Sequence, residues 1–415
     1  MARYVRRADG RATLTSGSTL AAAHPRVAGT VGASGKRRLR VLFCLDSFHV
    51  GGSELNAIRT AERLDPERIE LSVACLRTDG PLWQRYEALG VRREHFPLSS
   101  FAHPGTLTQA YRFARFVRRH RFDIVQSHDV YNNIFAIPAA RAAGFPATVA
   151  CRRWWTETPR RAHRVANRLA YRLADRVLVN SESIGSLVET EEGIARSRIT
   201  VIPNFVDDEA FQAPDSAWRQ QMRQKLGLRD DDLVIGSVAN LHAIKNHELL
   251  IRAASRLAER WPMLRLVIVG DGERRELLHS LAVQLGIGDR VVFAGLLPQH
   301  PSPHYLFDTS VLTSRGEGFP NSIVEAMAAG RPIVATAVGG VVDAFTDNVS
   351  GRLVPSDDVH AVAAAVEFYL CNSEARRAAG LAARREAEER YHARRILPLV
   401  HQLYEDLASD RARDR

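Results

Sequence analysis

The sequence predicts an α/β protein made of two doubly wound parallel sheets in tandem. Short apolar runs, such as 41–45 and 264–269, are typical of strands buried in a parallel sheet. Segments long enough for helices separate these runs, and this alternation is typical of a parallel sheet. The strand–loop–helix pattern ends near residue 211 and starts again at residue 233, so we expect two Rossmann-like halves. The 415 residues are enough for two domains with full cores.

The first half begins with the strand 41–45, a glycine turn and a helix. Gly51 and Gly52 allow a tight turn and a close backbone approach, and Glu54 falls in the first turn of the helix. Further helices are expected at 81–90, at about 107–119 and at 161–173. Further strands, some with the loop that follows them, are expected in the segments 69–76, 92–98, 123–129, 147–155, 175–184 and 198–211.

Two strand ends in this half carry polar residues that could contact a ligand. His128 ends one strand, where open α/β sheets bind ligands, although an ordinary surface histidine is the alternative. The segment 147–155 ends in two arginines and two tryptophans. The tryptophans could bind a sugar face or lipid headgroups, or cover the core. In the next helix we expect Arg161, Arg164, Arg168 and Arg172 on one face and Val165, Leu169 and Leu173 on the opposite face.

The second half repeats the pattern after a polar segment, 208–230, that reads as a linker. The segments 233–255 and 264–287 are strand–loop–helix units, and 290–295, 303–314 and 351–354 contain further strands. After Val359 the chain predicts amphipathic helices with the contact residues Leu381, Tyr391, Ile396, Leu399, Val400, Leu403, Tyr404 and Leu407.

The segment 314–340, SRGEGFPNSIVEAMAAGRPIVATAVGG, reads as loop, helix, turn, buried strand and glycine loop. Pro320 suits the start of a helix, and Gly330 suits its left-handed cap. The loop therefore lies before a helix N-terminus, where backbone N–H groups and the macrodipole favour an anion. Because Glu317 and Glu325 bracket that position, the pattern suits a ligand with both phosphate and hydroxyl groups, such as a sugar nucleotide.

Each glutamate also has a purely structural interpretation. Ser322 and Glu325 have the spacing of a capping box, so Glu325 could only cap the helix. Glu317 could be an ordinary acidic loop residue. The residue types alone leave both alternatives open.

The whole phrase EGFPNSIVEAMAAGRPIVAT resembles the E-x7-E signature of the family 4 retaining glycosyltransferases. Two further phrases are similar to that family: VIPNFVD, with Phe205 in place of a glycine, and VIVGDGERR. The resemblance spans about residues 39–408 and implies the GT-B fold, two Rossmann-like domains facing across a cleft. It implies an acceptor-side domain at 39–208, a donor-binding domain at 209–371, and helices at 372–415 that pack back on the first domain. The segment before them, 1–38, is expected to be a disordered tail because of its composition.

The resemblance also implies roles for individual residues at the donor. Lys245 would clamp the donor diphosphate, while Asn240 stands where the family usually has an arginine and His242 would replace it. Glu325 would bind the ribose hydroxyls, and Glu317 would hold the sugar with the backbone of the following loop. The remaining donor-binding residues implied are Gly51, Gly52, Gly270, Gly272, Gly318, Phe319, Pro320, Asn321 and Ser322.

On the acceptor side, the resemblance implies that His128 orients the sugar or excludes water. Arg153 and Trp154 are the expected acceptor-side residues. No metal or other cofactor is expected, because a lysine and a helix dipole supply the positive field. The carboxylates Asp230–Asp232 sit in a polar turn before a strand, so we do not expect them at the diphosphate.

The net charge of +10 is unevenly distributed. Residues 1–40 hold nine Arg and Lys against one Asp, and the band Arg112–Arg172 holds thirteen Arg against three acids. This band suggests an anionic partner, either a membrane surface or a phosphorylated acceptor, although a solvated helix face is the alternative. Nucleic acid is not expected, because no recognition motif accompanies the charge. The four cysteines show no metal-binding spacing and indicate a reducing compartment.

The sequence therefore favours a glycosyltransferase that uses a nucleotide-sugar donor and a carbohydrate or lipid-linked acceptor. By analogy with the family, it would act in surface polysaccharide or glycolipid synthesis, either in the cytoplasm or as a peripheral protein at the inner face of the membrane. The alternatives are a sugar-nucleotide epimerase on the same architecture and a non-catalytic module that binds anions or membranes.

Overall fold

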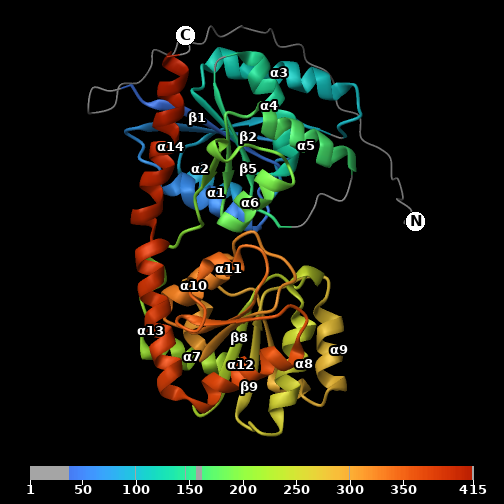
Figure 1. Ribbon diagram of the computed structural model, residues 1–415, viewed down its shortest axis with the longest axis vertical. Helices are drawn as coiled ribbons and strands as arrows, with labels where there is room; N and C mark the ends of the chain where they lie inside the picture. The colour runs from blue at the N-terminus through green and yellow to red at the C-terminus, as the bar shows by residue number, and fades with distance from the viewer. Residues whose placement is uncertain (1–36, 99, 145, 156–160, 299, 414–415) are drawn as a thin grey trace, which may run out of the picture.

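The computed structural model describes residues 37–413, except for residues 99, 145, 156–160 and 299. These residues form two lobes, each built around one parallel sheet with helices on both faces (Figure 1). The predicted class, two doubly wound parallel sheets, is confirmed. Of the predicted tail 1–38, residues 1–36 lie outside the described residues.

The sheet of the first lobe has seven strands in the order β3-β2-β1-β4-β5-β6-β7. The strands are β1 (Leu39–Leu45), β2 (Ile69–Cys75), β3 (Arg92–His95), β4 (Ile124–Ser127), β5 (Ala147–Arg152), β6 (Arg176–Val179) and β7 (Ile199–Val201). The helices are α1 (Gly52–Arg63), α2 (Trp83–Ala88), α3 (Gly105–His120), α4 (Val130–Ala143), α5 (Arg161–Leu173) and α6 (Glu182–Thr190), with short 3-10 turns at Arg196–Arg198 and Asp208–Phe211.

The sheet of the second lobe has six strands in the order β10-β9-β8-β11-β12-β13. The strands are β8 (Leu233–Val238), β9 (Leu264–Val269), β10 (Val291–Gly295), β11 (Thr309–Leu312), β12 (Ile333–Thr336) and β13 (Gly351–Val354). The helices are α7 (Ser216–Lys225), α8 (His247–Ala258), α9 (Arg275–Gln284), α10 (Asn321–Ala328), α11 (Val341–Ala344) and α12 (Val359–Cys371), with 3-10 turns at Ala243–Lys245, Gly288–Arg290 and Pro303–Leu306.

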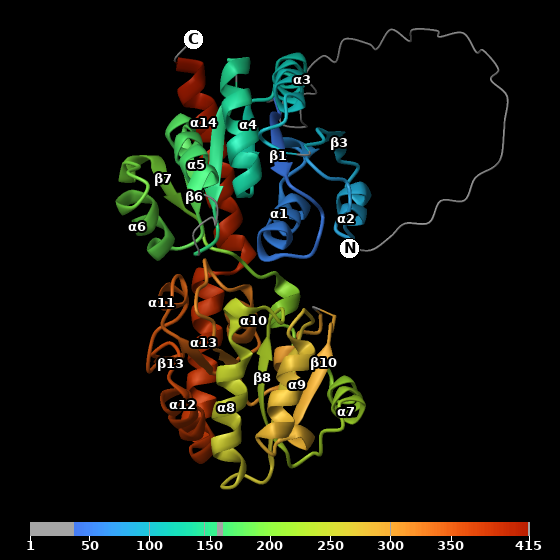
Figure 2. The ribbon, with the colours of Figure 1, turned by 90° about the vertical axis from the view of Figure 1, so that its right-hand side faces the viewer.

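Two C-terminal helices, α13 (Ser373–Arg390) and α14 (Ala393–Arg413), run along one side of both lobes (Figures 1 and 2). The apolar side chains of α14 join the core under β1, and the Tyr404 hydroxyl donates to Gln126 Oε1 at 2.9 Å. The helix therefore crosses back onto the first lobe, as expected. Of the predicted contact residues, Leu381 and Leu399 are instead exposed.

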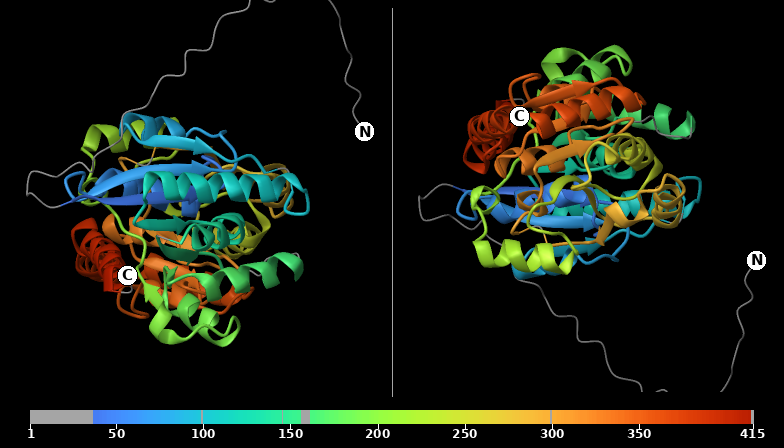
Figure 3. Two further views of the ribbon diagram at one scale, coloured as in Figure 1. Left: turned by 90° about the horizontal axis from the view of Figure 1, so that it is seen from above. Right: turned by 90° about the horizontal axis from the view of Figure 1, so that it is seen from below.

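The structure corrects the predicted orientation of α5, the arginine-rich helix. Val165 and Leu169 are 63% and 55% exposed, so they lie on the solvent side with the arginines. The helix instead buries Asn167, Ala170 and Tyr171. It packs against α4, which lies between α3 and α5 on one face of the sheet (Figures 2 and 3).

Both sheets have a point where the strand order reverses direction. In the first lobe β1 pairs in parallel with both β2 and β4, and in the second lobe β8 pairs in parallel with both β9 and β11. The loops that follow such strands diverge and leave room for a ligand. The loops after β1, β4, β8 and β11 are therefore where a site is expected.

Candidate functional site

The residues predicted to bind the donor follow the central strands of the two sheets. Gly51 and Gly52 follow β1, His128 follows β4, Lys245 follows β8, and Glu317 follows β11. The fold thus brings together loops that lie far apart in the sequence.

Glu317 and Lys245 form the centre of the site in the second lobe. Glu317 is 8% exposed, and its Oε1 atom accepts hydrogen bonds from Lys245 Nζ and Ser314 Oγ, each at 2.6 Å. Lys245 is placed by Asn246, which takes a left-handed conformation (φ 50°) to begin α8. Desolvated ion pairs need such hydrogen bonds to offset the cost of burial. The Glu317 carboxylate therefore balances the charge of Lys245 and accepts its hydrogen bond.

The helix α10 begins at Asn321, one residue later than predicted, with Pro320 as its N-cap. Ser322 lies within the helix and no side chain caps its N-terminus, so the capping-box interpretation is wrong. Glu325 instead accepts a hydrogen bond from Arg59 Nη2 on α1 at 2.8 Å. This ion pair joins the two lobes, and both side chains are largely buried.

The loop between Glu317 and α10 packs tightly against the first lobe. A Cβ atom on Gly318 would lie 2.1 Å from the Arg153 carbonyl oxygen, so only glycine fits there. The Gly318 carbonyl oxygen accepts from Ser181 Oγ at 2.9 Å. Asn204 Nδ2 donates to the Phe319 carbonyl oxygen at 3.0 Å and to Asn321 Oδ1 at 2.7 Å. These bonds fix the backbone before α10.

His128 and Arg153 lie on the other side of the same contact. His128 is buried, with its Nε2 atom 3.2 Å from Gln126 Nε2, and burial followed by the Arg153 charge lowers its pKa well below 6.5. The ring is therefore neutral at pH 7. Among the described residues its Nδ1 atom has no hydrogen-bond partner. Arg153 Nη1 donates to Asn204 Oδ1 at 3.0 Å, so Arg153 lies at the contact between the lobes.

Other predicted residues occupy less direct positions. His242 is exposed, and its Nδ1 atom lies 2.5 Å from Glu273 Oε2. Asn240, two residues earlier in the same loop after β8, is also exposed. Trp154 lines a separate cavity beside α5.

The predicted glycines differ in what they do for the backbone. Gly270 (φ 142°) and Gly272 let their loop pack against the loop after β8, because Cβ atoms there would lie 2.0 and 2.8 Å from carbonyl oxygens of that loop. Gly51 is the N-cap of α1 with an ordinary φ of −138°, and a Cβ on Gly52 would meet nothing within 4 Å. Neither has a positive φ, so the backbone conformation at this pair does not require glycine.

Sequence reasoning missed three residues that hold the lobes together, Arg59, Ser181 and Asn204. Arg59 occupies a buried position of α1, so a charged residue on the apolar face was the available signal. Asn204 lies inside the VIPNFVD phrase, where an asparagine after a strand was visible but its partners were not. Ser181 caps α6 and also bonds the opposite lobe.

Comparisons with known proteins match both lobes. The family model described as Glycosyltransferase Family 4 matches residues 50–210, and that described as Glycosyl transferases group 1 matches residues 219–386. The chain is 30% identical over 322 residues to the GDP-mannose-dependent alpha-(1-6)-phosphatidylinositol monomannoside mannosyltransferase of Mycolicibacterium smegmatis, covering 73% of the chain and 83% of the relative. The chain belongs to the group 1 glycosyltransferases.

Two further comparisons extend over most of this glycosyltransferase. It is 28% identical over 321 residues to the putative glycosyltransferase EpsF of Bacillus subtilis, covering 76% of the chain and 82% of the relative. The crystal structure of Anabaena Alr3699/HepE in complex with UDP superposes with a TM-score of 0.78 at 23% identity, covering 89% of the chain and all of that protein. At this identity the structural likeness shows the fold alone, and that fold is the expected GT-B arrangement.

The described part of the glycosyltransferase has neither a cluster of metal ligands nor a membrane-spanning helix. Within it, no three His, Cys, Asp or Glu side chains are grouped so that they could hold a metal ion. Asp232, one of the carboxylates considered from the sequence, is buried and pairs with Arg265 at 3.2 Å. No helix in this part is both apolar and long enough to cross a bilayer.

Proposed function

We propose that this glycosyltransferase moves a hexosyl group from a nucleoside-diphosphate sugar to a carbohydrate or lipid-linked acceptor, with retention of anomeric configuration. The observation that carries the proposal is the Lys245–Glu317 pair beside the N-terminus of α10. It places a cation, a carboxylate and a helix dipole together, which suits a ligand with both diphosphate and hydroxyl groups.

In this proposal the donor exchanges partners with the ion pairs of the site. Lys245 leaves Glu317 for the departing diphosphate, whose negative charge is the largest to develop during transfer. Glu317 and the amides of Phe319–Asn321 then hold the sugar, and Glu325 leaves Arg59 for the ribose hydroxyls. His242 reaches the phosphates only if it leaves Glu273.

On the acceptor side, neutral His128 orients the transferred sugar and helps to exclude water. A neutral imidazole donates one hydrogen bond and accepts another, which suits a hydroxyl group. The acceptor hydroxyl attacks on the face from which the diphosphate leaves, and a donor phosphate oxygen takes its proton. This path gives retention without a covalent intermediate on the protein.

The proposed chemistry needs no metal, because Lys245 and the dipole of α10 supply the positive field. Treatment with a chelator should therefore leave turnover unchanged. A loss of turnover that Mg²⁺ restores would contradict this part of the proposal.

A binding panel of labelled UDP-, GDP- and ADP-sugars tests the donor class. The names of similar proteins include both UDP and GDP-mannose, so the base is the first unknown to resolve. Conversion of the bound sugar nucleotide without any acceptor would favour an epimerase instead. No binding of any sugar nucleotide would contradict the whole proposal.

We also propose that the helical face of α3 and α5 contacts an anionic membrane surface. Leu107 and Tyr111 on α3 are 78% and 68% exposed, and Leu169 on α5 is exposed between Arg168 and Arg172. Apolar side chains interleaved with arginines suit the headgroup region of an anionic bilayer. A peripheral position at the inner face of the membrane, and a role in polysaccharide or glycolipid synthesis, follow from this proposal.

A further inference from the structure

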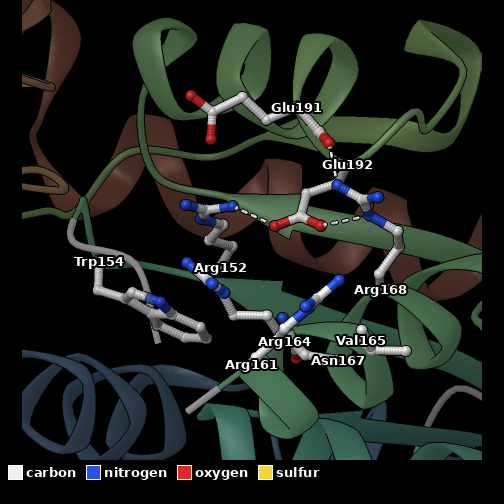
Figure 4. A pocket seen from close by; sticks show the side chains of 9 residues that line it. All are labelled: Arg152, Trp154, Arg161, Arg164, Val165, Asn167, Arg168, Glu191 and Glu192. Atoms are coloured by element: carbon white, nitrogen blue, oxygen red, sulfur yellow. Dashed lines mark hydrogen bonds and ion pairs between the residues drawn. The ribbon is translucent and has the colours of Figure 1, made fainter. Parts of the chain in front are cut away.

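The side chain of Trp155, in the loop after β5, extends from the first lobe to the second. In its own lobe Trp155 is half-buried and packs against the apolar cluster that includes Ala150 and Val179. The preceding residue, Trp154, lines the cavity beside α5 together with Arg152 (Figure 4). The two adjacent tryptophans therefore face different parts of the molecule.

Two glycines of the second lobe contact the indole ring of Trp155. A Cβ atom on Gly316 would lie 2.8 Å from Trp155 Cδ1, and a Cβ atom on Gly339 would lie 3.0 Å from Trp155 Cδ2 and Cε3. These distances are shorter than the usual contact between carbon atoms, so a larger residue at either position would have to displace the ring or the backbone. The backbones of both loops therefore approach the ring directly.

Both glycines lie beside the backbone of Glu317. Gly316 precedes Glu317 in the chain. Gly340, which follows Gly339, donates from its backbone N–H to the Glu317 carbonyl oxygen at 3.0 Å. The indole therefore packs against the residue before Glu317 and against the loop that holds the Glu317 carbonyl group.

The same part of the second lobe is joined to the loop that carries Lys245. The backbone N–H of Arg315 donates to the carbonyl oxygen of Ile244 at 2.8 Å, directly before Lys245. A Cβ atom on Gly316 would lie 3.6 Å from Ile244 Cδ1, so the Ile244 side chain also reaches this point. The indole of Trp155 is therefore in contact with the place where the loops of Lys245 and Glu317 meet.

We propose that Trp155 is a positioning residue that holds these two loops in their working arrangement when the lobes are together. In the proposed transfer Lys245 leaves Glu317 for the diphosphate, and the Glu317 carboxylate then keeps only its bond from Ser314. A large, rigid indole packed beside Glu317 keeps its backbone in place during this exchange. The inference rests on the proposed transferase function and adds a residue of the first lobe that acts through Glu317.

The kinetics of Trp155→Leu test this role, with the nucleotide sugar that the unmodified chain binds. We expect kcat to fall by about tenfold or more, because a small displacement of a positioned group has a large effect on the rate. The dissociation constant of the donor should change much less, since Lys245 and the N-terminus of α10 remain. Trp155→Phe keeps an aromatic ring and should recover most of the lost kcat.

Trp261→Leu is the matched control. Trp261 is also half-buried, but it lies after α8 and donates from Nε1 to Glu367 Oε1 at 3.3 Å, within the second lobe. This variant should leave kcat unchanged, and thermal unfolding should show that both variants are folded at the assay temperature. An unchanged kcat in folded Trp155→Leu, or an equal loss in Trp261→Leu, overturns the inference.

A double-mutant cycle with Gly316 tests the contact itself. Gly316 has no positive φ, so the strain of Gly316→Ala comes from the contact with the indole. Gly316→Ala should therefore lower kcat. The double variant Trp155→Leu/Gly316→Ala should be no slower than Trp155→Leu alone, because leucine leaves room for the added methyl group. Full turnover in Gly316→Ala, or two losses that multiply in the double variant, contradicts the inference.

Donor binding by the unmodified chain distinguishes failure of this inference from failure of the proposed function. If the chain binds and turns over a nucleotide sugar, and the variants of Trp155 and Gly316 do so equally well, this inference falls and the transferase proposal stands. If the chain binds no nucleotide sugar, the transferase proposal falls, and the positioning role that rests on it falls as well.

Discussion

The two lobes match their charges in opposite ways. Where the second lobe meets the first, Lys245 is paired with Glu317 and Glu325 with Arg59, each at hydrogen-bond distance. In the cavity beside α5, two guanidinium groups share one carboxylate, because Glu192 accepts from both Arg152 and Arg168. Paired charges must be exchanged when a ligand binds, whereas excess charge attracts a ligand of opposite sign. We therefore expect partner exchange when a ligand binds where the lobes meet, and attraction of anions beside α5.

The largest expected effect comes from removing the cation of the donor site. Lys245→Ala should lower turnover of a nucleotide sugar by about 10²–10³-fold, because one preorganised group that stabilises developing charge is lost. The exposed Lys225 on α7 provides the matched control, and Lys225→Ala should leave turnover unchanged.

Thermal unfolding must accompany these measurements, because Lys245→Ala also leaves Glu317 buried without its cation. Lys245→Arg keeps a positive charge beside Glu317. Compared with Lys245→Ala, it should recover more of the thermal stability than of the turnover. If folded Lys245→Ala retains full turnover, the donor site does not depend on this exchange.

Partner exchange at Glu325 predicts two variants with opposite results. Glu325→Ala should weaken donor binding by about 10–100-fold, since hydrogen bonds from hydroxyl groups to a carboxylate are lost. Arg59→Ala should keep donor binding or tighten it, because Arg59 holds the same carboxylate oxygen in the structure. Titration calorimetry with the donor measures both constants. Equal weakening in both variants would show that the pair only holds the lobes together.

The donor loop could be predicted from the sequence because its signals are local. Pro320, Gly330 and the apolar run at 333–336 lie within a few residues of the elements they define, so the loop, helix, cap and strand were found. The partner of Glu325 could not be found in this way. Arg59 lies 266 residues away, and no local rule connects it to the motif.

The first lobe was predicted less well for two physical reasons. Helix α4 was not predicted, since it contains Pro138 and starts with the β-branched and polar run Val130–Asn133. Its N-terminus is capped by Asp129, which accepts from Asn132 N at 2.9 Å. Helix α5 was predicted, but its pattern does not say which face packs, and Asn167, Ala170 and Tyr171 meet the core instead of Val165 and Leu169.

One buried group in each lobe should respond to pH with the opposite sign. In the second lobe, burial lowers the pKa of His304 to about 4, so the folded state keeps this ring neutral. The unfolded ring binds a proton below about pH 6.5. Stability is therefore present above that pH and lost as the pH falls toward 4, by about 1.4 kcal/mol per pH unit. The unfolding free energy of the unmodified chain minus that of His304→Gln, measured by urea unfolding, should show this loss.

In the first lobe, Asp129 provides the opposite sign. Burial raises its pKa to about 7, so the folded state keeps a proton that the unfolded state releases near its ordinary value. Stability should therefore fall as the pH rises toward 7, and Asp129→Asn should remove this slope. If the contributions of His304 and Asp129 to the unfolding free energy changed with pH in the same direction, the buried environments assigned to them would be contradicted.

The smallest expected effect concerns the exposed face of α5. If Leu169 inserts among lipid headgroups, Leu169→Ser should weaken binding to anionic vesicles by about fivefold, which corresponds to roughly 1 kcal/mol of apolar burial. Leu381 on α13 is a matched exposed leucine in the other part of the molecule, so Leu381→Ser should have no effect. Sedimentation with phosphatidylglycerol vesicles, and with phosphatidylcholine vesicles as the uncharged control, measures both. Because the arginines attract the anionic surface, added salt should weaken binding to the first and not to the second. The contrary outcome is that both leucine variants bind anionic vesicles as the unmodified chain does, while added salt still abolishes binding. That result would show that the positive charge of this lobe acts alone and that the apolar side chains do not insert.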